Sequence, residues 1–109
     1  MNRKGNIFNN GRLAGVLEES GAGCSFTYAE NYLVDSHSKP ICIAMPKRSD
    51  AYRSQYLFPF FHGLLSEGVT KEIQCRKLKI DEHDHFGRLL KTAGGDVIGS
   101  ITVEEVPAS

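Results

Sequence analysis

The segment DEHDHF, residues 81–86, brings together side chains of the kinds that bind metal ions: Asp81, Glu82, His83, Asp84 and His85. Two histidines on one helix typically bind a metal when they are four residues apart, because that spacing places them on one face. His83 and His85 are two residues apart, so on a helix they would point roughly 200° away from each other. Acidic residues in the first turn of a helix also interact favourably with its dipole. We therefore expect this segment to begin a helix, with Asp81 as its N-cap, and not to bind a metal.

Other catalytic motifs are absent from the sequence. DHFG, residues 84–87, looks like the Asp-Phe-Gly magnesium motif of protein kinases, but His85 interrupts it. No glycine-rich phosphate loop, GxSxG motif or Cys-His signature accompanies it. His62 lies in an apolar segment, where a histidine is more often a polar edge residue than a base. We therefore predict that the protein is not an enzyme and uses no catalytic residue, metal or cofactor.

Composition indicates one soluble globular domain, residues 1–109, with 40% hydrophobic and 24% charged residues. Thirteen basic residues balance thirteen acidic ones, so no net charge attracts the chain to nucleic acid or to an anionic membrane. No signal peptide or membrane span is visible, and we expect a cytoplasmic protein. The cysteines are widely spaced and favour reduced thiols over zinc or disulfides: Cys24, Cys42 and Cys75.

The first half of the chain has the patterns of β-structure. Asn10 and Gly11 lie between two apolar-bearing arms and supply the positive φ angles of a type I′ hairpin turn. In CSFTY, residues 24–28, apolar and polar side chains alternate as in a strand with one buried face. AENYL, residues 29–33, suggests a single helical turn. ICIAMP, residues 41–46, predicts a short strand that ends at its proline.

LFPFFHGLLSEG, residues 57–68, predicts the first full helix. Pro59 suits the first turn, and Gly68 can end the helix in a left-handed conformation. Phe60 lies to the side of an apolar face formed by Leu57, Phe61, Leu64 and Leu65. Most of these apolar side chains, together with Phe58, are expected in the core of the domain.

Two more helices and a strand are predicted after Gly68. In the first helix, VTKEIQCRKLK, we expect Val69, Ile73 and either Leu78 or Ile80 to face inward. The next helix has the spacing i, i+3, i+4, i+7 over Phe86, Leu89, Leu90 and Ala93, and stops at Gly94 and Gly95. VIGSITVEEV, residues 97–106, then returns to a strand, in which Gly99 indicates a bulge or a close backbone approach.

The order of strands, helices and a last strand predicts an α+β fold. We expect a small antiparallel sheet or a partly closed barrel, built from the N-terminal hairpins and the C-terminal strand and covered by about three helices. The last strand should pair with the sheet, because otherwise it would leave an exposed edge.

Several segments resemble, in order, the N-terminal subdomain of the HipA toxin kinases. LFPFFHGLLSEG resembles the family's PFF-x-x-LLPEG, and IFNNGRLAGVLEES resembles its first hairpin. FTYAENYL, PICIAMPKRSDAY and HFGRLLKTAGGDVIGSITV resemble three further family patterns, so the resemblance covers nearly the whole chain. Ser66 replaces the usual proline of LLPEG, and Ser100 replaces the usual alanine after Gly99.

Because the chain ends at Ser109, before any kinase core, it resembles HipS, the small component of split HipBST toxin–antitoxin systems. The resemblance implies a non-catalytic protein that binds and restrains a separate HipT/HipA-like serine/threonine kinase. A HipB-like protein would supply the DNA contact, so we expect no direct nucleic-acid binding and no membrane contact. The alternatives are an assembly or folding subunit of such a kinase and, in another class, a nucleic-acid-binding module using Lys47, Arg48, Arg53, Tyr52 and Tyr56.

The resemblance also places the end of the helix predicted at residues 57–68 toward the kinase. The expected partner contacts are Phe60, Ser66, Glu67, Gly68 and Val69. Residues 66–68, which we call the SEG segment, could equally serve only to cap the helix. The remaining motif positions are expected to be structural: Asn10, Gly11, Pro59, Phe61, Leu64, Leu65, Gly95, Asp96 and Gly99. For Asp96 this role would be a hydrogen bond in a turn.

Overall fold

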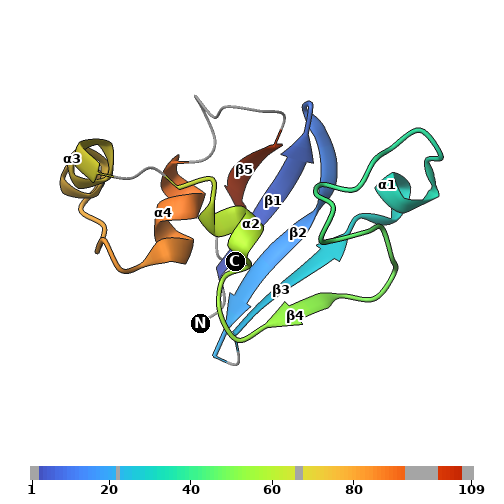
Figure 1. Ribbon diagram of the computed structural model, residues 1–109, viewed down its shortest axis with the longest axis horizontal. Coiled ribbons are helices and arrows are strands. Elements are labelled where there is room, and N and C mark those ends of the chain that lie inside the picture. The colour runs from blue at the N-terminus through green and yellow to red at the C-terminus, as the bar shows by residue number, and fades with distance from the viewer. Residues whose placement is uncertain (1–2, 22, 66–67, 93–100, 107–109) are drawn as a thin grey trace.

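The computed structural model describes residues 3–21, 23–65, 68–92 and 101–106 of the 109-residue chain (Figure 1). Along the chain its elements are β1 (Arg3–Asn9), β2 (Arg12–Ser20), β3 (Gly23–Tyr28), α1 (Glu30–Val34), β4 (Tyr52–Ser54), α2 (Pro59–His62), α3 (Gly68–Leu78), α4 (His85–Thr92) and β5 (Ile101–Val106). None of the described helices is long and apolar enough to cross a membrane.

The strands form one antiparallel sheet in the order β4-β3-β2-β1-β5. The β1–β2 turn has φ angles of 53° at Asn10 and 80° at Gly11, as a type I′ turn requires. β5 returns to pair with β1, where Val103 lies opposite Ile7. The predicted α+β fold, first hairpin and returning strand are therefore confirmed. The alternative of a partly closed barrel is wrong, because β4 and β5 are the two open edges of the sheet.

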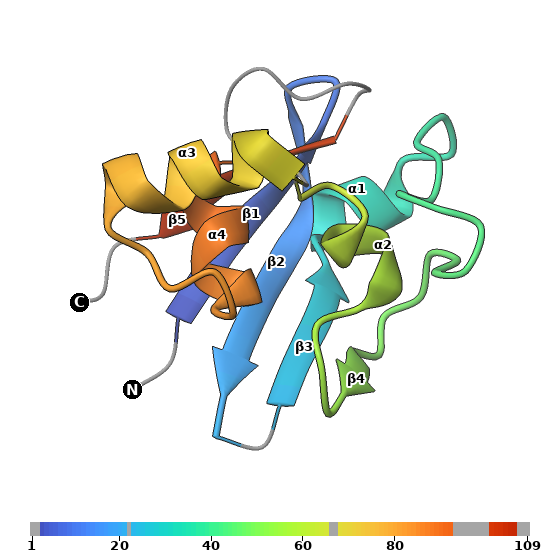
Figure 2. The same cartoon turned by 60° about the vertical axis from the view of Figure 1, so that its left-hand side comes forward.

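The core lies between one face of the sheet and the helices α2 and α4 (Figure 2). Phe26 of β3 is fully buried, and its ring centroid lies 5.8 Å from that of Phe61 on α2 and 4.9 Å from that of Tyr28. Gly15 opposes Tyr28 at the same face, and a Cβ there would come within 2.4 Å of the Thr27 carbonyl oxygen. Only glycine therefore lets β2 and β3 pack this closely beneath the aromatic cluster.

The strand predicted at residues 41–46 is wrong, and the fourth strand is β4 instead. Residues 41–46 form turns that bury Ile41 and Met45 but leave Ile43 99% exposed. They are held by Tyr28, whose hydroxyl donates to the Met45 carbonyl and accepts from the Ile41 N–H at 3.1 Å. Burial raises the pKa of Tyr28 to about 12, so this hydroxyl keeps its proton.

The helix predicted from Leu57 to Gly68 is shorter than expected. Pro59 lies at its start as predicted, but α2 ends at His62 because the chain tightens into i→i+3 hydrogen bonds at the next residues. Phe61 and Leu65 are buried, and Leu64 packs against the core. Gly68 has the predicted positive φ, 63°, but it begins α3 and does not end α2.

Helix α4 confirms the predicted apolar spacing but not the predicted cap. Its buried side chains are Phe86, Leu89 and Leu90. The N-cap is Asp84, whose Oδ1 accepts from the Gly87 N–H at 3.2 Å. Asp81 instead closes a local turn by accepting from the His83 N–H at 2.8 Å. The predicted positions Ala93, Gly94, Gly95, Asp96 and Gly99 lie outside the described residues.

Candidate functional site

The predicted partner contact is only partly within the described chain. Phe60 is half-buried, with its ring edge-on to Phe61 at a centroid distance of 5.2 Å, so it packs on the core while keeping an accessible edge. Gly68 is exposed at the start of α3. Ser66, Glu67 and the side chain of Val69 lie outside the described residues. Their role in partner binding therefore stays a prediction.

Asp84, from the segment DEHDHF at residues 81–86, connects helix α4 to the sheet. Arg3 of β1 donates to both carboxylate oxygens of Asp84 at 2.9 Å, and its Nε donates to Glu19 of β2 at 2.7 Å. The Arg3 guanidinium also lies 5.4 Å from the centroid of the Phe86 ring. The hydrogen bond from Arg3 lowers the pKa of Asp84 and raises that of Arg3. This carboxylate is thus an anchor between the sheet and α4.

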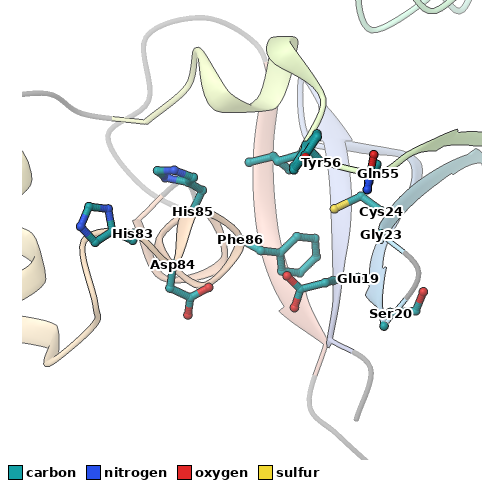
Figure 3. A pocket seen from close by; sticks show the side chains of 12 residues that line it. Glu19, Ser20, Gly23, Cys24, Gln55, Tyr56, His83, Asp84, His85 and Phe86 are labelled. Carbon is teal, nitrogen blue, oxygen red and sulfur yellow. The ribbon is translucent and has the colours of Figure 1, made fainter.

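A shallow cleft of about 470 Å³ opens beside this anchor (Figure 3). Cys24, Gln55 and Tyr56 lie on its strand side, and His83 and His85 lie on its helical side. Cys24 is buried, and its burial raises the pKa of the thiol, which disfavours the nucleophilic thiolate. The cleft therefore offers a mixed polar and apolar surface in which the Cys24 thiol is not activated.

The two ring systems of His62 and His85 meet where α2 approaches α4. Their centroids are 4.7 Å apart and the rings are edge to face. Burial, and then the positive charges of His62 and Arg88, lower the pKa of His85, which favours its neutral form. Within the described residues no group of three His, Cys, Asp or Glu side chains could hold a metal ion.

Part of the basic stretch considered for nucleic-acid binding makes contacts within the chain. The Lys47 ammonium donates to the carbonyl oxygens of Asp35 and Ser38, both at 3.0 Å. Arg48 stacks over the ring of Tyr52, with its guanidinium carbon 3.7 Å from the ring centroid. Arg48 and Arg53 are exposed, so these contacts withdraw mainly Lys47 from the set of cations that this alternative needs.

Helix α3 forms where it was predicted but differs from the prediction in the side chains that it exposes. Ile73, which we expected to face inward, is 51% exposed. Of Leu78 and Ile80, one of which we expected to face inward, Leu78 is 46% exposed and Ile80 is half-buried. Apolar and polar residues are distributed evenly around this helix, so it lacks the apolar face of a core helix. Sequence periodicity could have revealed that absence, because no i, i+3, i+4 apolar set exists between Gly68 and Leu78.

Comparisons with known proteins agree with this fold. The family model of the HipA N-terminal domain matches residues 5–104, so the chain belongs to the HipA N-terminal domain family. A solved structure, the N-terminal domain of HipA toxin, is 28% identical with a TM-score of 0.74, and the match covers 98% of this chain and 95% of that one.

Two curated relatives have very different lengths. An uncharacterized protein of Haemophilus influenzae is 31% identical over 103 residues, which are 94% of this chain and 92% of that protein. A Sinorhizobium fredii protein named "Putative kinase Y4mE" is 31% identical over 97 residues, which are 88% of this chain but only 23% of that protein. The same domain thus makes up nearly all of one relative and less than a quarter of another.

Proposed function

We propose that this chain is a non-catalytic toxin–antitoxin component that binds and restrains a separate HipT/HipA-like serine/threonine kinase. The observation that carries the proposal is the match to a kinase-named protein over 23% of its length, combined with a relative that is almost entirely this domain. The same domain occurs inside a larger kinase-named chain and also as nearly the whole of a small protein. A separate copy of it would therefore be suited to docking on the kinase part of such a larger chain.

The local chemistry supports a binding role over a catalytic one. Asp84 is paired with Arg3, and the Cys24 thiol is buried with a raised pKa. Two of the polar side chains that line the described cleft are therefore poorly suited to act as base or nucleophile. In this proposal a HipB-like partner supplies the DNA contact, in keeping with the neutral overall charge of this chain.

The test mixes the purified chain with a HipA-like kinase core from the same organism and measures both binding and autophosphorylation. We expect a Kd of about 1 μM or tighter and reduced autophosphorylation. Binding without a change in activity would replace restraint by an assembly role. An absence of binding to such kinases would overturn the proposal.

The predicted contact segment is tested with a charge reversal. Glu67→Arg should weaken kinase binding, because the resemblance places Glu67 toward the kinase. Glu30→Arg is the matched control, since Glu30 is exposed on α1, at the other end of the molecule from α3. Equal affinities of the two variants would show that the SEG segment only connects α2 to α3.

A further inference from the structure

Helix α3 lies at one end of the molecule, with α4 between it and the sheet, whereas α1 lies at the opposite end (Figures 1 and 2). It packs against α4 and buries little of its own surface. An 11-residue helix is marginally stable by itself, so its position depends on what it packs against.

The two sides of α3 differ in a way that reverses the usual arrangement of a surface helix. The side that is half-buried carries polar groups, namely Lys71, Gln74 and Cys75. The Gln74 Oε1 atom is buried there without a hydrogen-bond partner, as is the Nδ1 atom of His85 on α4. An unpaired buried polar atom costs free energy, so the seam between α3 and α4 is imperfectly satisfied.

The opposite side presents an apolar residue between cations. Ile73, Arg76 and Lys77 are all exposed, and their i, i+3, i+4 spacing places them on one face, which we call the α3 outer face. Residues 68–79 contain four basic residues and one acidic residue, although the whole chain is neutral. Basic residues near a helix C-terminus interact favourably with the dipole, but this does not explain the exposed isoleucine.

We propose that the α3 outer face is a docking surface for the kinase, on which it meets an acidic patch with an apolar centre. This inference rests on the proposed function. The positive charges of Arg76 and Lys77 are complementary to an acidic partner surface, and Ile73 would be buried against an apolar residue within that surface. In the sequence, α3 begins at Gly68, directly after Ser66 and Glu67 of the predicted contact segment. Nucleic acid would use the cations alone and leave Ile73 in solvent.

The experiment compares two double variants with the same chemical changes at different places. Ile73→Asp with Lys77→Glu alters the α3 outer face. Ile43→Asp with Lys39→Glu makes the same replacements in the loop between α1 and β4, where Ile43 is 99% exposed and Lys39 is also exposed. All four side chains are exposed, so both variants should fold, which circular dichroism and thermal unfolding would verify.

We expect the α3 variant to bind the kinase core at least tenfold more weakly and the loop variant to bind like the wild type. Wild-type affinity should also fall with added salt, because the docking charges are at the surface. Equal affinities of the two variants would overturn the inference while leaving the proposed function intact. An absence of wild-type binding would overturn both. Wild-type binding to duplex DNA that the α3 substitutions abolish, with kinase binding unchanged, would assign the face to nucleic acid and overturn the inference.

Hydrogen exchange gives a second readout that does not depend on substitutions. Kinase binding should slow the exchange of amides in Gly68–Leu78 more than that of amides in α1. Protection that appears elsewhere but not in α3 would contradict the proposed surface.

Discussion

Helices α3 and α4 follow one another in the chain but bury their side chains in opposite ways. In α4, Phe86, Leu89 and Leu90 are at most 5% exposed and face the sheet. In α3, Ile73 is 51% exposed while Gln74 is half-buried. The burial of α4 accounts for its place in the fold, whereas the fold itself gives no account of the exposed face of α3. The difference separates a helix that stabilises the domain from one whose apolar residue is available to a partner.

The largest expected effect on stability comes from the centre of α4. Leu89→Ala should lower the free energy of unfolding by about 2–5 kcal/mol, because Leu89 is fully buried and its truncation leaves a cavity. Urea unfolding followed by circular dichroism measures this directly. A loss below about 1 kcal/mol would mean that α4 is as loosely held as α3, and the comparison would fail.

The cap of α4 should give the next largest effect. Asp84→Ala removes both the N-cap and the pair with Arg3, and should cost about 1–2 kcal/mol. Asp84→Asn should cost less, because asparagine still caps the helix. Asp81→Ala is the control at the position that the sequence favoured, and a larger effect there would restore Asp81 as the cap.

The pH dependence of the Asp84 effect has a definite sign. Arg3 lowers the pKa of Asp84 in the folded protein, so its stabilising contribution is present above the unfolded value near 4. That contribution is lost as the pH falls through the folded pKa. The stability difference between wild type and Asp84→Asn should therefore shrink in acid, and a difference that grows on acidification would contradict the assigned pair.

The elements that the sequence predicted correctly depend on local signals. The Asn10-Gly11 turn needs only two adjacent residues that accept positive φ, and α4 repeats its apolar residues with the helical period. The alternation in β3 likewise places Cys24, Phe26 and Tyr28 on one buried face. Such patterns need no knowledge of the rest of the chain.

The elements that the sequence did not predict depend on distant contacts. Residues 41–46 are apolar enough for a strand, but the Tyr28 hydroxyl binds their backbone and fixes turns instead. Arg3 and Asp84 are separated by 81 positions, so no local pattern could identify Asp84 as both cap and ion-pair partner. The spacing of α3 already shows that it lacks an apolar face, but which of its residues face outward depends on its contact with α4.

A smaller effect is expected at the junction where the helices meet. Burial lowers the pKa of His85, and the positive groups around it come from every helix of the junction: His62 on α2, Lys71 on α3, Arg88 on α4 and the adjacent His83. In the unfolded chain His85 has the ordinary histidine pKa of about 6.5, so the unfolded chain binds more protons than the folded chain near that pH. The free energy of unfolding therefore falls as the pH drops below about 6.5.

His85→Gln removes this titration and should flatten the stability profile between pH 7 and pH 5. The change should be smaller than the Asp84 effect, because the His85 ring is only half-buried. His37→Gln is the matched control, since His37 is exposed in the loop after α1. If stability depended on pH in the same way in His85→Gln as in the wild type, protonation of His85 would not contribute to the stability of the domain.

The smallest effect on stability should come from Ile73→Ala, and its smallness is what the comparison requires. Half of the Ile73 surface is already exposed, so truncation should change the free energy of unfolding by less than about 0.5 kcal/mol. Ile101→Ala provides the contrast within the same residue type, because Ile101 is only 7% exposed on β5. If Ile73→Ala destabilised the domain as much as Ile101→Ala, Ile73 would belong to the core and could not serve as an anchor for a partner. If it left stability unchanged but weakened kinase binding, the two helices would be separated by function as well as by burial.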